Sequence, residues 1–260
     1  MHAAQHIPAP GLVSFVGAGP GDPELLTLKG RKAIEEAALV LYAGSLVPRE
    51  VVACAAPEAI VRDSAPLTLA QSHALVRETA LAGKAVARVH TGDPSLYGAL
   101  REQAALLDAE GIPWRVIPGV TAACAAAAAA GVSFTVPEVT QSLVISRLEG
   151  RTPMPPGERL EKLAAHGTSM AVYLSAAGAE TLQEKLLQAL PPETTVICAH
   201  RVGWPDEQLV RTPLGELAAC ARRHNFARQT VFLILPGEGR EGAPSRLYDA
   251  RFSHGFRAAR

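Results

Sequence analysis

The sequence has no excess of charge of either sign. Its 260 residues carry 25 Lys and Arg against 25 Asp and Glu, so the formal net charge is zero. A protein that wraps a nucleic acid normally shows a basic excess, and we therefore expect no nucleic-acid partner. Local clusters of basic residues can still hold a small acidic ligand.

Closely spaced cysteines and long hydrophobic runs are also absent. The four cysteines lie far apart without a C-x-x-C pair, and each has apolar neighbours; they are Cys54, Cys124, Cys198 and Cys220. We expect buried free thiols, a reducing cytoplasmic location and no metal site. Residues 1–10 do not resemble a signal peptide, and the alanine-rich run 122–130 is too short to span a bilayer. We therefore expect no membrane partner either.

The composition favours a large folded core. Hydrophobic residues make up 48% of the chain and charged residues 19%, which excludes global disorder. In the first half, short apolar runs alternate with helical stretches, one of which is a predicted helix over residues 96–109. Strands separated by helices predict β-α-β units and a mainly parallel sheet.

A second alternating pattern follows a break at residues 118–121. Its strand-like runs lie closer together after residue 195, which predicts a mixed sheet. We therefore expect two α/β domains, an N-terminal one over residues 11–118 and a C-terminal one over residues 119–240. Residues 241–260 lack periodicity, and we expect a mobile tail there.

Three glycine-containing loops follow three of the predicted strands. They are V-G-A-G-P-G-D-P over residues 16–23, H-T-G-D-P-S-L-Y-G over residues 90–98 and P-G-V-T-A over residues 118–122. Glycine lets a backbone approach a ligand closely, and ligands bind at the carboxyl edge of parallel sheets. Each loop alone could be an ordinary turn, with Asp93 or Ser95 capping a helix. Three such loops at one edge favour a ligand site.

The first loop does not fit a phosphate-binding turn. A dinucleotide fingerprint needs a glycine where Asp22 stands, and Pro20 and Pro23 remove two N–H donors. The second strand also ends at Tyr42 rather than at an acidic residue that would hold a ribose. A nucleotide-binding oxidoreductase is therefore kept only as an alternative from a different class.

Together the three loops resemble the tetrapyrrole methylase family, whose hallmarks are a G-x-G-P-G-D loop, a G-D-P loop and a G-V-T/S-A segment in this order. The resemblance covers about residues 12–237. Three further stretches are similar to family members that methylate carbon 11 of precorrin-4 or cobalt-precorrin-4: P-E-V-T-Q over 137–141, E-G-R-T-P-M-P over 149–155 and W-P-D-E over 204–207. Whether the substrate carries cobalt stays open, and a sister enzyme acting at another ring carbon is the alternative.

The resemblance implies a homodimer whose subunits bind S-adenosylmethionine in a cleft between two domains. The expected activity is methyl transfer to carbon 11 of the tetrapyrrole in cobalamin biosynthesis. Because methyl transfer from a sulfonium is an in-line displacement that depends on positioning, neither a metal nor a covalent intermediate is required. The family's cofactor positions fall on Pro20, Gly92, Asp93, Leu96, Thr121, Ala122, Leu174 and Val202.

The acetate and propionate groups of such a substrate would need cationic side chains. The candidates, each of which could equally be a solvated surface charge, are Arg62, His90, Arg147, Arg151 and Arg201. Arg151 is the best supported, because it lies in the E-G-R-T-P-M-P stretch. The candidates for polar contact near the reacting carbon are Asp93 and Tyr97, and no residue is identified as a general base.

Overall fold

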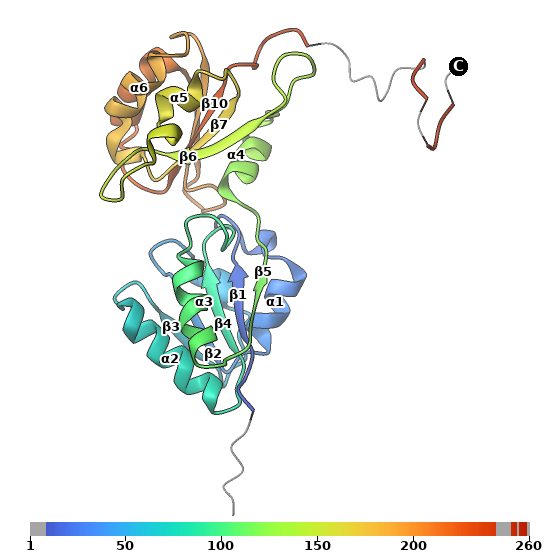
Figure 1. The fold of residues 1–260 in the computed structure, drawn as a ribbon, viewed down its shortest axis with the longest axis vertical. Coiled ribbons are helices and arrows are strands. Elements are labelled where there is room, and N and C mark those ends of the chain that lie inside the picture. Colours follow the sequence, from blue (N-terminus) through green and yellow to red (C-terminus); the bar gives the residue numbers. More distant parts are fainter. Residues whose placement is uncertain (1–8, 243–250, 254, 259–260) are drawn as a thin grey trace, which may run out of the picture. The chain divides into compact units, whose positions relative to one another are not determined.

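The computed structural model describes residues 9–242, 251–253 and 255–258, which fold into two compact α/β units (Figure 1). The first unit comprises the chain up to Ala125 together with Val202–Asp206, and the second comprises Ala126–Arg201 and the chain from Glu207 on. The domain limits expected from the sequence, 11–118 and 119–240, place residues 202–206 in the second domain instead. Most of the expected tail, 241–260, lies outside the described residues.

The first unit is built on a five-stranded parallel sheet with the order β3-β2-β4-β1-β5. Each of its three longer helices joins two consecutive parallel strands, as a right-handed β-α-β crossover requires. The strands are β1 (Val13–Gly17), β2 (Leu39–Tyr42), β3 (Ile60–Asp63), β4 (Val86–His90) and β5 (Trp114–Ile117), and the helices are α1 (Leu28–Glu35), α2 (Leu69–Leu81) and α3 (Leu100–Ala109).

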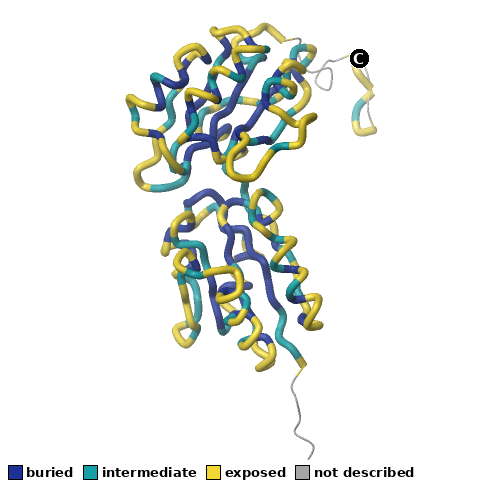
Figure 2. The backbone as a smooth tube through the Cα atoms, turned by 60° about the vertical axis from the view of Figure 1, so that its left-hand side comes forward, coloured by how far each residue is buried: buried dark blue, intermediate teal, exposed yellow. Residues whose placement is uncertain are grey.

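Both faces of this sheet are covered, and successive strand residues pack on opposite sides. Val16 and Val40 pack with Ile34 of α1, whereas Phe15 and Leu41 belong to a second cluster beneath α2 and α3. Figure 2 shows the buried residues gathered along the strands and the exposed residues along the outer sides of the helices. Burial on both faces explains why the central strands β1 and β2 are mostly apolar.

Helix α3 begins later than the sequence pattern predicts. The expected helix over residues 96–109 loses its first turn because Tyr97 and Ala99 have φ angles of 56° and 49°. Between them, a Cβ added to Gly98 would lie 2.5 Å from the carbonyl oxygen of Pro94. Residues 96–99 therefore form a tight turn at the carboxyl edge of the sheet, and the helix follows it.

The second unit contains a mixed sheet with the order β6-β7-β10-β8-β9. Strands β6 and β7 are parallel, while β10 is antiparallel to both β7 and β8. Strands β6, β7 and β8 thus run in one direction, and their carboxyl ends share one edge of the sheet. The elements are β6 (Leu143–Arg147), α5 (Leu160–Ala164), β7 (Ser169–Tyr173), α6 (Ala179–Leu187), β8 (Thr195–His200), β9 (Gln208–Pro213), α7 (Leu217–Arg223) and β10 (Thr230–Leu235).

One apolar cluster joins this sheet to helices α5, α6 and α7, with Met170 and Phe232 fully buried at its centre. The alanine-rich helix α4 (Ala122–Ala130) contains the division between the two units. Among the residues with described positions, no helix is both long and apolar enough to cross a membrane.

The cysteines are all free, as expected, but they are not all buried. Cys198 and Cys220 lie inside the second unit with their Sγ atoms 4.0 Å apart, and burial raises the pKa of the Cys198 thiol. Cys54 is half-buried and Cys124 is exposed. The prediction of four buried thiols is therefore wrong for these two residues, because apolar neighbours in the sequence do not decide whether a side chain is covered in the folded chain.

Candidate functional site

The three glycine-containing loops meet at the carboxyl edge of the parallel sheet. Gly19 and Gly92 exchange two backbone hydrogen bonds, with N···O distances of 3.2 and 2.7 Å. The amide of Gly119 donates to Oδ2 of Asp93 at 3.0 Å. The loop after β4 is therefore bonded to the loops after β1 and after β5.

Glycine is required at positions 17, 92 and 119 for two different reasons. A Cβ added to Gly17 would lie 2.4 Å from the amide nitrogen of Gly119, and one added to Gly119 would lie 2.2 Å from the carbonyl oxygen of Gly92. Gly92 has room for a Cβ, whose nearest atom would be the Cα of Thr121 at 3.8 Å, but its φ is 59°. Positions 17 and 119 thus need glycine for close packing, and position 92 needs it for its left-handed backbone.

Most of the expected cofactor positions come together in this loop cluster. Gly92 faces Thr121 and Ala122, whose Cα and amide nitrogen would lie within 4 Å of a Cβ at position 92. Leu96 donates its amide hydrogen to the Asp93 carbonyl oxygen at 3.1 Å. Pro20 lies in the loop after β1, and the buried Val202 begins the segment that joins the first unit from the far half of the chain.

Both carboxylate oxygens of Asp93 accept hydrogen bonds from the loops around it. Oδ1 accepts hydrogen bonds from the amide and hydroxyl groups of Ser95, and Oδ2 accepts the one from Gly119. Burial raises the pKa of Asp93, but the hydrogen bonds from Ser95 and Gly119 outweigh this effect and leave the pKa below its usual value. The carboxylate is charged near neutral pH and holds two loops together.

His90 does not fit its expected role as a cationic substrate contact. The side chain is 6% exposed and lies 5.8 Å from the ring of Phe15, centroid to centroid. Burial, together with the nearby charge of Arg88, lowers the pKa of His90 to about 3. A neutral imidazole that is buried in this way cannot form an ion pair with a substrate carboxylate, so we do not retain His90 as a binding residue.

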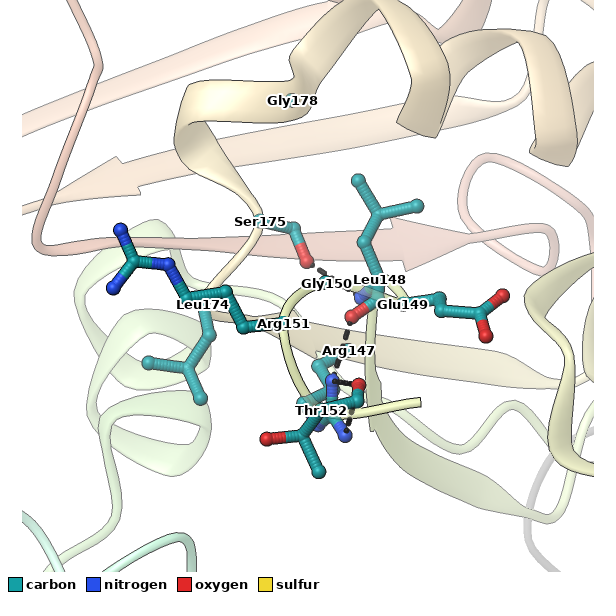
Figure 3. A pocket seen from close by; sticks show the side chains of 9 residues that line it. All are labelled: Arg147, Leu148, Glu149, Gly150, Arg151, Thr152, Leu174, Ser175 and Gly178. Atoms are coloured by element: carbon teal, nitrogen blue, oxygen red, sulfur yellow. Dashed lines mark hydrogen bonds between the residues drawn. The ribbon is translucent and has the colours of Figure 1, made fainter. Parts of the chain in front are cut away.

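A pocket of about 310 Å³ lies in the second unit at the carboxyl ends of β6 and β7 (Figure 3). Ser175 ties its two sides together, since its hydroxyl accepts from the Leu148 amide at 2.8 Å and donates to the Tyr173 carbonyl at 2.6 Å. The lining residues are Arg147, Leu148, Glu149, Gly150, Arg151, Thr152, Leu174, Ser175 and Gly178.

Arg147 shapes the pocket loop and is not aimed at a ligand. Its Nη1 donates to the carbonyl oxygens of Leu148 and Thr152 at 3.0 and 3.1 Å. Its Nη2 donates to the carbonyl oxygens of Thr152 and Pro153 at 3.2 and 3.4 Å. Because most of its donors are occupied by backbone, we assign Arg147 to holding residues 148–153 in place.

Two other arginines remain at this edge of the second unit. Arg151 is exposed and makes no hydrogen bond or ion pair with any residue that the structure describes; in Figure 3 its side chain and that of Glu149 extend in opposite directions. Arg201 follows β8, and its Nη1 donates to Oε1 of Gln229 at 2.8 Å. By contrast, Arg62 lies exposed on β3 of the first unit, outside the three glycine-containing loops and the pocket.

Three of the expected site residues have left-handed backbones although none is glycine. They are Tyr97, Leu174 and Arg201, with φ angles of 56°, 53° and 48°. Such conformations are costly and tend to occur at functional sites. Leu174 is also 72% exposed and Tyr97 47% exposed, so both offer large side chains to a ligand. Across the described ranges, no group of three or more His, Cys, Asp or Glu residues could hold a metal ion.

Comparison with known proteins identifies a family whose model matches most of the chain, including the three loops. The family model of the Tetrapyrrole (Corrin/Porphyrin) Methylases matches residues 12–218. The cobalt-precorrin-4 C(11)-methyltransferase of Priestia megaterium is 40% identical over 248 residues, which cover 94% of this chain and 96% of the relative. The precorrin-4 C(11)-methyltransferase of Pseudomonas aeruginosa is 42% identical over 246 residues, which cover 94% and 98%.

Solved structures share the fold. A crystallographic structure of the cobalamin biosynthetic enzyme cobalt precorrin-4 methyltransferase has a TM-score of 0.84 and 39% identity, covering 86% of this chain and 94% of that one. The uroporphyrin-III C-methyl transferase of Thermus thermophilus, complexed with S-adenyl homocysteine, has a TM-score of 0.70 and 26% identity, covering 86% and 97%. The expected α/β fold, with one parallel and one mixed sheet, is confirmed.

The hydrogen bonds of Asp93 predict a pH-dependent contribution to stability. Because its pKa is lowered in the folded chain, the carboxylate stabilises the fold above its unfolded-state pKa of about 3.9, and this contribution is lost as the pH falls through the folded-state pKa. We expect Asp93→Asn to reduce the free energy of unfolding by about 1 kcal/mol at neutral pH, and the difference to shrink below about pH 4. Urea denaturation over a pH series measures both.

A matched control keeps the carboxylate and removes one of its donors. Ser95→Ala should shift the loss of stability to higher pH, because the Asp93 pKa would be lowered less. If the difference between the unchanged chain and Asp93→Asn stays constant across the acidic range, Asp93 does not bond its two neighbours as described.

Proposed function

The chain belongs to the tetrapyrrole (corrin/porphyrin) methylase family, and on this basis we propose that it transfers a methyl group from S-adenosylmethionine to carbon 11 of precorrin-4 or cobalt-precorrin-4 in cobalamin biosynthesis. The observation that carries the proposal is the full-length match. Relatives named for this reaction are 40% and 42% identical over 94% of the chain. All three glycine-containing loops and the pocket loop lie inside the region that the family model matches.

The loop cluster of the first unit has the properties that a methyl donor without phosphate groups would need. Pro20 and Pro23 provide no amide hydrogens for a phosphate, so the ligand would be held by close backbone contact. A side chain at Gly92 would fill the space next to Thr121 and Ala122. The solved relative complexed with S-adenyl homocysteine supports this choice of ligand. Leu174, whose apolar side chain is exposed on the second unit, stays an expected cofactor position that the family resemblance implies.

The proposed reaction depends more on the alignment of methyl donor and acceptor carbon than on acid or base catalysis. S-adenosylmethionine supplies an electrophilic methyl group. The protein must hold the donor and the acceptor so that this methyl group lies within about 3–3.5 Å of the ring carbon. Asp93 would contribute indirectly, because its oxygens are occupied in fastening the loops. Tyr97 remains the candidate for polar contact near the reacting carbon, on an exposed side chain above a strained turn.

Regiochemistry would follow from how the macrocycle is held by its carboxylates. Arg151 and Arg201 both lie at the edge where β6, β7 and β8 end. Planar guanidinium groups bind carboxylates through paired hydrogen bonds. We assign Arg151 to direct substrate contact and Arg201 to a second contact beside Gln229. The homodimer, the cytoplasmic location, and the absence of metal, nucleic-acid and membrane partners stay predictions.

Incubation with precorrin-4 tests the reaction directly. The purified chain, supplied with methyl-labelled S-adenosylmethionine, should produce a tetrapyrrole that has gained one methyl group, and NMR should place the label on carbon 11. Parallel reactions with metal-free and cobalt-loaded substrate decide which form is used. Label at another ring carbon would instead establish a sister methylase, and no transfer with either form would reject the proposal.

A pair of glycines tests the proposed cofactor contact. The unchanged chain should bind S-adenosylhomocysteine in the micromolar range, about −8 kcal/mol, and should not bind NAD. Gly92→Val should abolish this binding. Gly111 has a similar φ of 64° with no atom within 4 Å of a Cβ, so Gly111→Val incurs the same backbone cost of about 1–2 kcal/mol away from the site.

Calorimetry and thermal denaturation of both valine variants separate binding from folding. Gly111→Val should lose stability and keep its affinity. Normal affinity in folded Gly92→Val would show that this loop is only a turn.

Arg151 provides a separate test of substrate binding. Arg151→Ala should lose roughly 1.5–3 kcal/mol of substrate affinity through the lost charge-assisted hydrogen bonds, while affinity for S-adenosylhomocysteine should barely change. Arg151→Lys should recover only part of the loss, because a point charge cannot replace the planar fork. Titration of substrate into each variant measures the effect, with Arg223→Ala on the exposed side of α7 as the control. Equal affinities for Arg151→Ala and Arg223→Ala would mean that Arg151 is an ordinary surface charge.

A further inference from the structure

Residues 202–206 provide a contact that the proposed function does not yet explain. They belong to the first unit, although they follow β8 of the second. Within the first unit, Nε1 of Trp204 donates a hydrogen bond to the carbonyl oxygen of Pro20 at 3.2 Å, across 184 positions of sequence. The indole thus bonds to the loop after β1, at one of the expected cofactor positions.

The steric fit between this segment and the loop is close at two points. A Cβ added to Gly21 would lie 2.3 Å from Cδ1 and 2.6 Å from Nε1 of Trp204. A Cβ added to Gly203, whose φ is 78°, would lie 2.7 Å from the amide nitrogen of Asp22. Each of the two points therefore has a glycine on one side, Gly21 against Trp204 and Gly203 against Asp22, where a larger residue would clash.

This contact lies between two hydrogen-bonded anchors of the loop after β1. Gly19 is bonded to Gly92 before the contact, and after it the Leu25 amide donates to the Asp22 carbonyl oxygen at 3.0 Å. Pro20 and Gly21 lie between these two anchors. The indole hydrogen bond to Pro20 and the indole surface against Gly21 set the path of the backbone there.

We propose that Trp204 is a positioning residue for the methyl donor, which holds Pro20 and Gly21 in the shape that the ligand contacts. The proposal rests on the proposed function, because it takes the loop after β1 as part of the cofactor site. It also accounts for the third glycine of the G-A-G-P-G-D loop: position 21 is small to accept the indole. The alternative is a purely structural role, in which Trp204 only fills space and its removal affects folding alone.

Substitutions at Trp204 separate these two roles. Trp204→Phe keeps an aromatic ring but loses the N–H donor, and Trp204→Ala loses both. We expect the dissociation constant for S-adenosylhomocysteine to rise several-fold in Trp204→Phe and about tenfold or more in Trp204→Ala. The KM for S-adenosylmethionine should rise accordingly, while the KM for the tetrapyrrole should stay near that of the unchanged chain. A residue that only fills space would lower the melting temperature without this split.

A double-substitution cycle tests the contact with Gly21. Gly21→Ala alone should weaken cofactor binding, because the new methyl group meets the indole. In the Trp204→Ala background the same methyl group meets no ring, so Gly21→Ala should cost little more affinity there. The two substitutions should therefore be strongly non-additive, as is expected of residues in direct contact.

The chain offers its own matched control and reporter. It has two tryptophans, and the other, Trp114 at the start of β5, donates its Nε1 hydrogen to Asp108 at 2.7 Å, outside the three loops. Trp114→Phe should bind S-adenosylhomocysteine like the unchanged chain. It also leaves Trp204 as the single tryptophan, whose fluorescence should change as the ligand is titrated.

The outcomes distinguish the proposal from the function on which it rests. If the unchanged chain binds S-adenosylhomocysteine and both Trp204 variants bind it equally well, the positioning role is wrong and the proposed function stands. Additive effects of Gly21→Ala and Trp204→Ala would also overturn the positioning role. If the unchanged chain does not bind S-adenosylhomocysteine at all, the proposed function fails, and the positioning role fails with it.

Discussion

The contact between three backbones at Gly17, Gly92 and Gly119 is the constraint on which the candidate site depends. Their peptide groups lie so close that a single Cβ at position 17 or 119 would overlap a neighbouring main chain. This packing brings the ends of β1, β4 and β5 together without any side chain between them. Asp93 then adds a charged hydrogen-bond acceptor that links two of the loops. The result is a cluster of loops held together largely by main-chain atoms.

The second unit offers the opposite kind of chemistry. Arginines lie at or after the carboxyl ends of its parallel strands: Arg147 ends β6, and its hydrogen bonds hold the loop that carries Arg151. In the proposed reaction, arginines would bind the carboxylates of the acceptor, and local cationic side chains can bind acidic groups even in a chain with no net charge.

Backbone strain occurs at strand ends of the second unit, and a buried neutral side chain lies at the loop cluster of the first. Leu174 and Arg201 have left-handed backbones at the ends of two strands, and such conformations persist only where the surroundings hold them. The buried, uncharged His90 lies directly before the Gly92 loop, where it supports the loop from beneath. Residues that a sequence pattern suggests as ligands can thus be the support of a site, and their burial decides between the two roles.

Local sequence was sufficient for elements whose signals are local. The alternation of apolar runs and helical stretches predicted a parallel sheet in the first half and a mixed sheet in the second, and the structure has both, because these patterns are local. The order of the three loops likewise identified the family from the sequence. The first residue of α3 could not be predicted from the sequence, since nothing in the residue types of Tyr97 and Ala99 indicates a left-handed backbone. Nor were the roles of Arg147 and Trp204, because hydrogen bonds to carbonyl groups depend on where the folded chain places those groups, and for Trp204 the partner lies 184 residues away.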